Sequence, residues 1–436
     1  MIVLGSAAHR GTPVPETPKC PRIAFFDYLD VFEDFMPHYG IDQEAFATRW
    51  VGSGNHDFLA LVERDIGDVT WYSFTLRPEL REARHEVTGF RVRFLFSALP
   101  HRLLWRRFYL SRWSWRWRRA YPVFATLASY LSVPSLSFFK AMREDRPDLF
   151  FLQDYASGRF DVLLGIARVL GVPLIAYHSG SSPEGYLGKW LKKLTIRRAD
   201  CLIVSGRREL EMLQEEFSVP TERLRLILTP IDTEIFVPLD RREACLAAGL
   251  DPSRRHLLFI GRLQDSVKRV SSIIRAFAQS ARHYSDVDLL IAGSGPDEAM
   301  LKDLGERELP GRVRFLGWVA GDVEKANLYN SAECLILASK SEGFPTVIGE
   351  ALACGTPALA TDVGGVGELV ADGQTGWLIA PLDDQALAAR LSSVLRDPQA
   401  SASMRPRARA VAEKRVSRSA VGAALSECFS EVLARA

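Results

Sequence analysis

The stretch SEGFPTVIGEALACG, residues 341–355, carries the strongest indication of the fold. A glycine and a proline make its first part a loop, and the apolar run that follows predicts a helix that begins near Thr346. Two carboxylates, Glu342 and Glu350, stand on either side of this junction. A loop that leads into a helix presents free backbone N–H groups and a partial positive charge, which suit a phosphate group. The stretch therefore predicts either an anion site between two acids or, more simply, a capped helix with one solvated glutamate.

The sequence on the C-terminal side continues the pattern. Residues 357–370 read PALATDVGGVGELV and residues 372–378 read DGQTGWL, which predicts strand, glycine turn, short helix, turn and strand. With the Glu-x7-Glu pair and its Gly-Phe-Pro turn, this run resembles the donor-binding signature of the retaining glycosyltransferases of family 4. The resemblance extends over residues 171–396 and is only architectural before residue 150. It implies an α/β protein of the GT-B fold, in which two Rossmann-like domains with parallel sheets face each other across a cleft.

The resemblance also implies roles for individual residues. Glu342 is expected to hold hydroxyl groups of the transferred sugar, and Glu350 to hold the ribose of the nucleotide. Backbone groups of the junction are expected to contact the sugar and phosphate of the donor; the residues are Gly343, Phe344, Pro345, Thr346 and Val347. Gly317 is expected near the base, and Gly54, in a glycine loop ahead of a helix, near the donor phosphates. For Gly54 a purely structural turn is an equal alternative.

Two basic residues follow the first predicted strand of the second half. Arg262 stands at the end of the strand 257–260, after Gly261, and Lys268 stands beside the next helix. Transfer of a sugar from a nucleotide expels a diphosphate, and fixed cations stabilise its growing charge without a metal ion. The alternative is an exposed basic pair, but the pattern Gly-Arg-Leu…Lys-Arg matches the resembling family. The cleft-forming segments contain no Asp-x-Asp motif, so neither a metal nor another cofactor is expected.

A histidine ends one of the predicted strands of the first half. Residues 172–178 read VPLIAYH, which predicts a buried strand with His178 at its carboxyl end. Ligands bind outside the carboxyl ends of the strands in open parallel sheets. A lone histidine is more often structural, yet the resemblance implies that His178 contacts the transferred sugar.

Strand and helix patterns alternate along the chain, as a parallel sheet with crossover helices requires. The predicted strands are 22–28, 68–74, 87–96, 148–153, 172–178, 201–205 and 224–228, and then 257–260, 288–292, 313–316 and 334–338. The predicted domains are a flexible tail (1–20), a Rossmann-like acceptor domain (21–230), a Rossmann-like nucleotide-sugar donor domain (231–414) and a C-terminal helix that crosses back to the first domain (415–436).

Length and composition agree with two ordinary globular domains. The chain has 436 residues, of which 47% are hydrophobic, and this is enough for two cores. A formal net charge of +2 predicts no strongly charged partner, and nucleic acid is not expected. The six cysteines lack CxxC or metal-ligand spacing, and no apolar run reaches about eighteen residues, the length needed to span a membrane. A cytoplasmic protein with reduced thiols is expected.

One basic segment stands apart from this balanced composition. Residues 87–143 contain ten arginines and one lysine but no aspartate or glutamate. Within residues 102–119 an aromatic residue recurs every fourth position, at Trp105, Tyr109, Trp113 and Trp117. Such a helix suits the interface of an anionic membrane, where aromatic rings lie at headgroup depth and arginines meet phosphates. Packing of the tryptophans on the sheet is the alternative, and single-stranded nucleic acid is a third, weaker interpretation.

These features predict a retaining, metal-independent glycosyltransferase that moves a sugar from a nucleotide-sugar donor to an acceptor hydroxyl. The acceptor is expected to be a sugar or lipid-linked molecule, such as a precursor of a glycolipid or cell-surface polysaccharide, met at the inner face of the cytoplasmic membrane. Two alternatives belong to other classes: a nucleotide-sugar epimerase on the same fold, and a non-catalytic, membrane-associated binder of sugar nucleotides.

Overall fold

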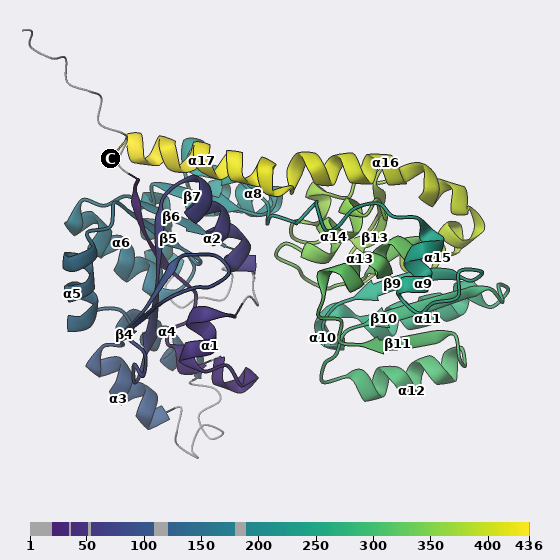
Figure 1. Cartoon of the computed structure of the whole chain (residues 1–436), viewed down its shortest axis with the longest axis horizontal. Helices are drawn as coiled ribbons and strands as arrows, with labels where there is room; N and C mark the ends of the chain where they lie inside the picture. The colour runs from purple at the N-terminus through teal and green to yellow at the C-terminus, as the bar shows by residue number, and fades with distance from the viewer. Residues whose placement is uncertain (1–19, 35, 51–53, 109–120, 179–188, 436) are drawn as a thin grey trace, which may run out of the picture.

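The computed structural model describes residues 20–34, 36–50, 54–108, 121–178 and 189–435. The strands of these residues form two separate sheets, one of eight strands and one of six, each covered by helices (Figure 1). The two sheets belong to two lobes that stand side by side, which confirms the α/β fold class with two facing parallel-sheet domains.

The first sheet has the order β3-β4-β2-β1-β5-β6-β7-β8. Its strands are β1 (Arg22–Phe26), β2 (Asp68–Thr75), β3 (Glu82–Arg84), β4 (Arg91–Phe96), β5 (Leu149–Leu152), β6 (Leu174–Tyr177), β7 (Cys201–Val204) and β8 (Leu224–Leu226). Neighbouring strands run parallel except β3, which pairs antiparallel with β4 at the edge. The sequence did not predict β3, and β4 begins four residues later than expected.

Helices cover both faces of the first sheet, because the side chains of its strands alternate in direction. They are α1 (Gln43–Thr48), α2 (Gly54–Asp65), α3 (Leu99–Phe108), α4 (Tyr121–Leu131), α5 (Leu136–Asp145), α6 (Gly158–Leu170), α7 (Lys189–Thr195) and α8 (Arg207–Phe217). In β1, Phe25 packs into the core on the side of α2, and Phe26 packs into the core on the side of α5 and α6.

The second sheet has the order β11-β10-β9-β12-β13-β14 and is parallel throughout. Its strands are β9 (Arg255–Ile260), β10 (Val287–Ala292), β11 (Val313–Gly317), β12 (Cys334–Leu337), β13 (Ala358–Thr361) and β14 (Gly376–Ile379). The associated helices are α9 (Arg241–Ala247), α10 (Asp265–Lys268), α11 (Val270–Ala281), α12 (Glu298–Glu308), α13 (Asp322–Ser331), α14 (Thr346–Ala353) and α15 (Asp384–Arg396).

Both sheets contain a point at which the strand order reverses. In the first sheet this point lies between β1 and β5, and in the second it lies between β9 and β12. The crevice outside the carboxyl ends of such a strand pair is where open α/β sheets bind their ligands. The order of the strands therefore marks one ligand-binding edge on each domain.

The last two helices join the domains. Helix α16 (Pro398–Arg415) lies along the second domain, and α17 (Arg418–Ala434) continues along the first (Figure 1). Between these helices Val416 accepts a hydrogen bond from the backbone N–H of Ile231, at 2.7 Å. The two chain crossings between the domains thus lie side by side. In α17, Phe429 packs into the first core, and the Sγ atom of Cys428 lies 3.3 Å from that of Cys201 in β7.

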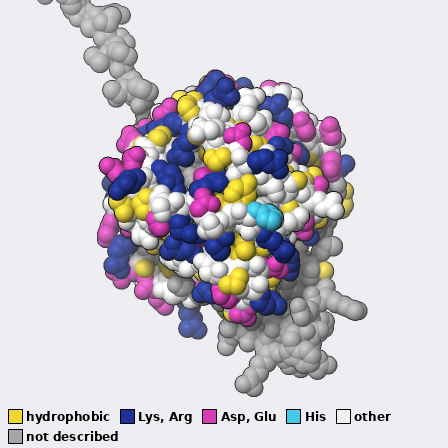
Figure 2. Space-filling view, turned by 90° about the vertical axis from the view of Figure 1, so that its right-hand side faces the viewer, with side chains coloured by type: hydrophobic (Ala, Val, Ile, Leu, Met, Phe, Trp, Pro, Cys, Tyr) yellow, Lys and Arg dark blue, Asp and Glu magenta, His cyan; other side chains and the backbone are white. Residues whose placement is uncertain are grey.

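The described part of the chain contains no helix with the length and hydropathy that crossing a membrane requires. On the outer face of the second domain, acidic and basic side chains are intermingled with hydrophobic ones (Figure 2). This face presents no extended surface of a single charge.

The basic, aromatic segment is described only in part. Trp105 lies in α3, and its indole Nε1–H donates a hydrogen bond of 2.6 Å to Asp34. The indole also packs against the first domain's core. For Trp105 the structure therefore favours packing over exposure. Tyr109, Trp113 and Trp117 lie outside the described residues, so a membrane-facing role for them stays a prediction.

Candidate functional site

The loop after β12 carries the first carboxylate of the predicted site. Pro345 occupies the N-cap position of α14, as the glycine- and proline-bearing turn predicted. Glu342 accepts a hydrogen bond from Lys268 Nζ, at 2.6 Å, and the two side chains are only 10% and 22% exposed. Two residues that are 74 positions apart in the sequence thus form one ion pair at the carboxyl edge of the second sheet. The sequence predicted a sugar contact for Glu342 and a diphosphate contact for Lys268 without a link between them, whereas in the structure the two side chains are paired.

Arg262 belongs to the loop between β9 and α10 and is free to meet a ligand. It stands two residues after β9 and is exposed. No described residue forms a hydrogen bond or ion pair with its side chain. A fixed cation that is not already paired is suited to an incoming anion, because no existing contact has to break.

The second carboxylate, Glu350, is held from two sides. One oxygen accepts a hydrogen bond from the Tyr329 hydroxyl at 2.7 Å, and the other accepts one from Lys325 Nζ at 3.2 Å. Lys325 also contacts Asp322, at 2.7 Å. Burial alone would lower the pKa of Lys325, but the carboxylates of Glu350 and Asp322 outweigh it and raise that pKa. The interactions fix Glu350 in one position at the wall of the cleft between the domains.

A glycine pair after β13 holds the loop that carries Glu342. Gly365 donates its backbone N–H to the carbonyl of Gly343, at 2.8 Å. Gly364 has a φ of 53°, and a Cβ atom at this position would lie 1.9 Å from the carbonyl oxygen of Glu342. Only glycine allows the two backbones to approach so closely. The Gly364–Gly365 turn therefore fixes the position of the carboxylate-bearing loop.

Gly317 has a similar supporting place at the end of β11. Its carbonyl accepts a hydrogen bond from Gly293, at 2.7 Å, and Gly293 lies against the backbone of Gly261, the residue before Arg262. The structure thus places Gly317 beside the loop that carries Arg262.

His178 follows β6 in the first domain. Its Nδ1 atom lies 3.5 Å from the largely buried carboxylate of Asp154. Burial would raise the pKa of Asp154, but the hydrogen bond and charge of His178, together with backbone N–H donors, lower it. The carbonyl of His178 accepts a hydrogen bond from Ser205 Oγ, at 3.3 Å.

The loop of Ser205 connects His178 to the second domain. A Cβ atom on Gly365 would lie 2.6 Å from the carbonyl of Ser205, so the two loops touch. Next to this contact, Arg208 forms an ion pair of 2.6 Å with Asp362. His178 and the Glu342 loop are therefore joined across the domain boundary by a short chain of contacts, made by the Ser205 hydroxyl and by backbone.

A cleft of about 800 Å³ opens between the two domains. Thr346 and Glu350 line it from the second domain, and Asp57 of α2 lines it from the first. Arg418, at the start of α17, forms two ion pairs. Its Nη2 atom lies 3.5 Å from Oδ1 of Asp57, and its Nη1 atom lies 2.5 Å from Oδ2 of Asp232. Burial raises the pKa of Asp57, although the charge of Arg418 opposes this rise. The cleft thus has charged groups from both domains.

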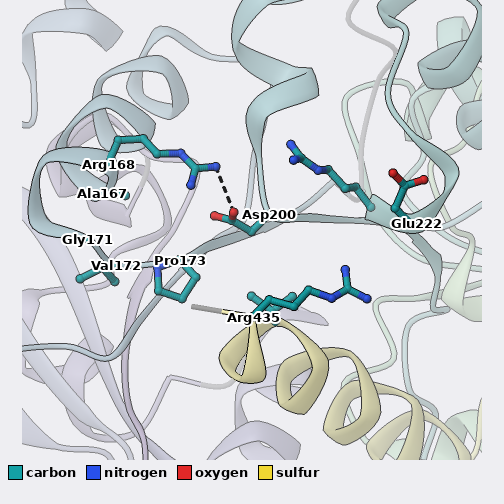
Figure 3. A pocket seen from close by; sticks show the side chains of 10 residues that line it. Ala167, Arg168, Gly171, Val172, Pro173, Asp200, Glu222 and Arg435 are labelled. Carbon is teal, nitrogen blue, oxygen red and sulfur yellow. Dashed lines mark hydrogen bonds and ion pairs between the residues drawn. The ribbon is translucent and has the colours of Figure 1, made fainter.

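Another hollow of about 500 Å³ lies at the opposite end of the first sheet (Figure 3). Val172 and Pro173, which precede β6, and Asp200, which precedes β7, line this hollow. Arg168 reaches across it to Asp200, at 3.0 Å. Because this hollow lies at the amino ends of the strands, it is remote from the edge where parallel sheets bind ligands.

Comparison with known proteins agrees with this geometry. The profile of the family described as "Glycosyl transferases group 1" matches residues 243–411, and that of "Glycosyltransferase Family 4" matches residues 66–235. A D-inositol 3-phosphate glycosyltransferase of Nocardiopsis dassonvillei is 30% identical over 307 residues, which cover 63% of this chain and 68% of that protein. The chain belongs to the family 4 glycosyltransferases.

Other relatives of this family 4 glycosyltransferase match a smaller part of their length. A D-inositol 3-phosphate glycosyltransferase of Mycobacterium sp. (strain KMS) is 34% identical over 213 residues, and the chain spans 46% of its length. Among solved structures, sucrose-phosphate synthase of Thermosynechococcus elongatus has a TM-score of 0.71 at 20% identity, and the match covers 95% of this chain and 100% of that one. The HepE protein of Anabaena, solved in complex with UDP, has a TM-score of 0.67 at 19% identity and covers 94% of this chain and 100% of its own. These likenesses show the GT-B fold.

The structure places the remaining residues of the predicted site as follows. Phe344 is buried in the second core, and Val347 packs against the same core. Gly54 begins α2, the helix whose Asp57 lines the cleft, while residues 51–53 of its loop lie outside the described residues. The buried side chain of Phe344 is therefore part of the core, so a donor contact from this residue is made by its backbone, whereas Val347 is partly exposed.

Several charged and polar residues of the site were missed by sequence reasoning. These are Lys325 and Tyr329, which hold Glu350, and Asp57, Asp232 and Arg418, which meet between the domains. Lys325 and Tyr329 stand four positions apart and therefore on one face of α13, which is the signal that sequence reasoning could have used. Arg418 is far in the sequence from its partners Asp57 and Asp232, so no spacing pattern could have indicated these ion pairs.

Proposed function

We propose that this chain is a retaining, metal-independent glycosyltransferase that transfers a sugar from a nucleoside-diphosphate sugar to an acceptor hydroxyl. The ion pair of Lys268 and Glu342 is the observation that carries the proposal. It combines a cation for a leaving diphosphate with a carboxylate for sugar hydroxyls, at the strand-order reversal of the second sheet. The free guanidinium of Arg262 adds a second, bidentate cation.

Each side chain has one task in the proposed reaction. Arg262 and Lys268 neutralise the charge that grows on the diphosphate as the glycosidic bond breaks. Glu342 accepts hydrogen bonds from the sugar, Glu350 accepts them from the ribose, and His178 contacts the sugar from the first domain. The acceptor hydroxyl attacks from the side that the diphosphate leaves, and its proton passes to the leaving phosphate. Configuration at the anomeric carbon is thereby retained.

The relatives support the classes of donor and acceptor. The HepE protein of Anabaena was solved in complex with UDP, which supports a nucleoside diphosphate in the cleft of this chain. The names of the relatives from Mycobacterium and Nocardiopsis include D-inositol 3-phosphate, which supports a polyol hydroxyl as the attacking group here.

The proposal includes a lipid-linked or polysaccharide-precursor acceptor that the protein meets at an anionic membrane surface. Its support is the run of ten arginines without a carboxylate between residues 87 and 143. Co-sedimentation with vesicles of anionic lipid, but not with vesicles of neutral lipid, is expected to depend on the arginines of residues 102–119 and to fall with salt. Equal binding to both kinds of vesicle would contradict this part of the proposal.

Replacing Glu350 by glutamine is expected to raise the Michaelis constant of the donor roughly 10- to 100-fold, with a smaller change in kcat. A hydrogen bond to a charged group contributes about 1.5–3 kcal/mol, and a glutamine side chain would lack the charge that the ribose hydroxyls and Lys325 meet. Steady-state kinetics with varied donor measures the effect.

Glu333→Gln is the matched control for this change. Glu333 is also a partly buried glutamate in an ion pair, 2.7 Å from Arg255, but it precedes β12 and so lies at the opposite edge of the same sheet. Its replacement is expected to alter stability and leave the donor constant unchanged. Unaltered donor affinity in Glu350→Gln would refute the ribose role.

The reaction itself is tested by incubating the protein with nucleotide sugars in the presence of a chelator. Release of the nucleoside diphosphate, and an α-linked product from an α-linked donor by NMR, are expected. An inverted product would overturn the retaining mechanism, and a free isomer of the donor sugar without transfer would favour an epimerase.

A further inference from the structure

A carboxylate of the second domain meets a helix end of the first domain. Glu368, the last residue of the 3₁₀ helix η6 (Val366–Glu368), accepts a hydrogen bond of 2.9 Å from the backbone N–H of Arg207. Arg207 begins α8, which lies on the side of the first lobe that faces the second (Figure 1). The two residues are 161 positions apart in the sequence. Only the arrangement of the two domains therefore brings them together.

Helix α8 lacks a capping side chain of its own. The first N–H groups of a helix have no partner within the helix, and a side chain of the N-cap residue commonly accepts a hydrogen bond from one of them. In α8 the N-cap residue is Gly206, which has no side chain. A Cβ atom at this position would lie 3.2 Å from the carbonyl oxygen of Gly364, so a larger residue would press against the second domain. Glu368 thus takes over part of the capping role, and its charge meets the positive end of the helix.

The second domain fixes the carboxylate of Glu368. Its other oxygen accepts a hydrogen bond of 2.9 Å from Nη2 of Arg415, at the end of α16, and Nη1 of the same arginine donates to the backbone carbonyl of Glu368. The side chain of Glu368 is only 8% exposed. Val366 and Leu369, on either side of it, are buried in the second core. The position of the carboxylate is therefore set by the second domain.

A second contact holds the same helix end. The guanidinium group of Arg208 donates hydrogen bonds of 2.6 Å to the carboxylate and to the backbone carbonyl of Asp362, the residue that follows β13. We call these two contacts, Arg207 with Glu368 and Arg208 with Asp362, the interdomain clasp. Arg208 is mostly exposed, so its ion pair contributes less than the buried contact of Glu368.

The clasp lies next to both halves of the proposed site. On the first domain, Ser205 precedes the N-cap residue of α8, and its hydroxyl donates a hydrogen bond to the carbonyl of His178. On the second domain, Gly365 precedes η6, and its N–H donates a hydrogen bond to the carbonyl of Gly343, in the loop that carries Glu342. The segments that the clasp joins are thus the segments that hold His178 and the Glu342 loop.

We propose that Glu368 is a positioning residue of the transfer reaction. By holding the N-terminus of α8, it sets the place of His178 relative to the donor sugar, which the second domain binds. This inference rests on the proposed function, because it concerns the alignment of the two halves of the same site. Glu368 itself contacts neither donor nor acceptor. Nucleotide binding, which depends on the second domain, is therefore independent of Glu368.

The first test measures the clasp without any activity. Hydrogen–deuterium exchange of residues 205–213, followed by mass spectrometry, is compared between wild type, Glu368→Gln, Glu368→Ala and the control Glu413→Ala. Glu413 is an exposed glutamate of α16 that pairs with Arg409 of the same helix, at 2.7 Å. Exchange is expected to be faster in Glu368→Ala, because the amide of Arg207 loses its acceptor, and less so in Glu368→Gln, which keeps an acceptor oxygen. Glu413→Ala is expected to match wild type.

The second test uses kinetics. In Glu368→Ala, kcat for transfer is expected to fall roughly 10- to 100-fold, the effect of a small misplacement of a contacting group, with an intermediate loss in Glu368→Gln. Thermal stabilisation by UDP, GDP, ADP and dTDP is expected to stay unchanged. In a His178→Ala background, Glu368→Ala is expected to cause less than about a two-fold further loss, because it acts through His178; a merely structural residue would lower kcat by the same factor in both backgrounds. Arg208→Ala, which removes the exposed contact, is expected to lower kcat a few-fold and repeats the comparison if Glu368→Ala does not fold.

Several results would overturn the inference and leave the proposed function standing. They are unchanged exchange in Glu368→Ala, an undiminished kcat despite faster exchange, and equal losses with and without His178. Loss of nucleotide stabilisation in Glu368→Ala would also overturn it, since the residue would then act on the donor site. A wild-type protein that binds no nucleotide, or that binds it and transfers no sugar, refutes the proposed function and with it the positioning role, whatever the exchange data show.

Discussion

Replacing Lys268 by alanine is expected to lower kcat roughly 100- to 1000-fold. Loss of one fixed donor to a developing charge costs about 2.7–4 kcal/mol of transition-state stabilisation in enzymes of known mechanism. Lys268 already forms an ion pair of 2.6 Å with Glu342, and both side chains are mostly buried, so the ammonium group is held in position before the donor arrives. The change also leaves Glu342 without its cation and weakens its hold on the sugar. Initial rates of diphosphate release at saturating donor measure the effect.

Lys302→Ala is the control for Lys268→Ala. Lys302 also forms an ion pair with a glutamate, Glu298, at 2.7 Å. The two residues stand four positions apart on α12, and about half of the lysine side chain is exposed. Such surface pairs contribute about 0.3–0.5 kcal/mol, so this variant should keep its activity. If Lys268→Ala were as active as Lys302→Ala while folded, the diphosphate role of Lys268 would be wrong.

Replacing Gly364 by alanine is expected to reduce kcat/KM for the donor by at least about ten-fold while the protein remains folded. A Cβ atom there would lie 1.9 Å from the carbonyl of Glu342, so the loop that carries this carboxylate has to move away. The hydrogen bond from Gly365 to Gly343 holds the loop in place from the same side. A displacement of about 1 Å at a positioning residue is enough for large losses of rate.

Gly373→Ala separates this clash from the general strain of a positive φ. Gly373 has a φ of 71°, comparable to the 53° of Gly364, but a Cβ atom there would have no neighbour within 4 Å. The left-handed conformation costs about 1–2 kcal/mol for an L-residue at either position. Both variants should therefore lose stability, Gly364→Ala the more because of its clash, and only Gly364→Ala should lose activity. Equal activity of the two variants would show that the Glu342 loop tolerates the shift.

The carboxyl edge of the second sheet could be predicted from the sequence because its signals are local. Apolar runs located β9 and β12, and the loop from Glu342 to Pro345 was recognised from its glycine and proline. What the sequence did not contain is the pairing of Lys268 with Glu342, because a contact across 74 positions depends on the order of strands in the sheet.

Helix α16 was not predicted, and the reason is physical. Pro406 lies inside it, and a proline removes one backbone hydrogen bond of a helix. The helix forms because Met404, Ala408 and Ala412 are buried against the second domain. Tertiary packing here outweighs local propensity, and no local pattern reports it.

The cluster of acids around the buried Arg159 in the first domain could not be predicted from the sequence, for a different reason. Asp27, Asp30 and Asp34 look like ordinary loop residues in the sequence, and Arg159 like a surface position of a helix. Only the fold shows that Arg159 is buried beneath them. A buried ionic group is recognised by its surroundings, which come from β1, β5 and α6 together.

Thermal unfolding with UDP, GDP, ADP and dTDP, in a chelator, is the sharpest test of the donor site. A ligand at about a hundred times its dissociation constant stabilises the folded state by about 2.7 kcal/mol, which shifts the midpoint temperature by a readily measured amount. We expect a shift with at least one of these nucleotides without metal, and its loss in Lys268→Ala but not in Lys302→Ala. A shift that requires a divalent metal, or an unchanged shift in Lys268→Ala, would rule out the metal-free diphosphate site.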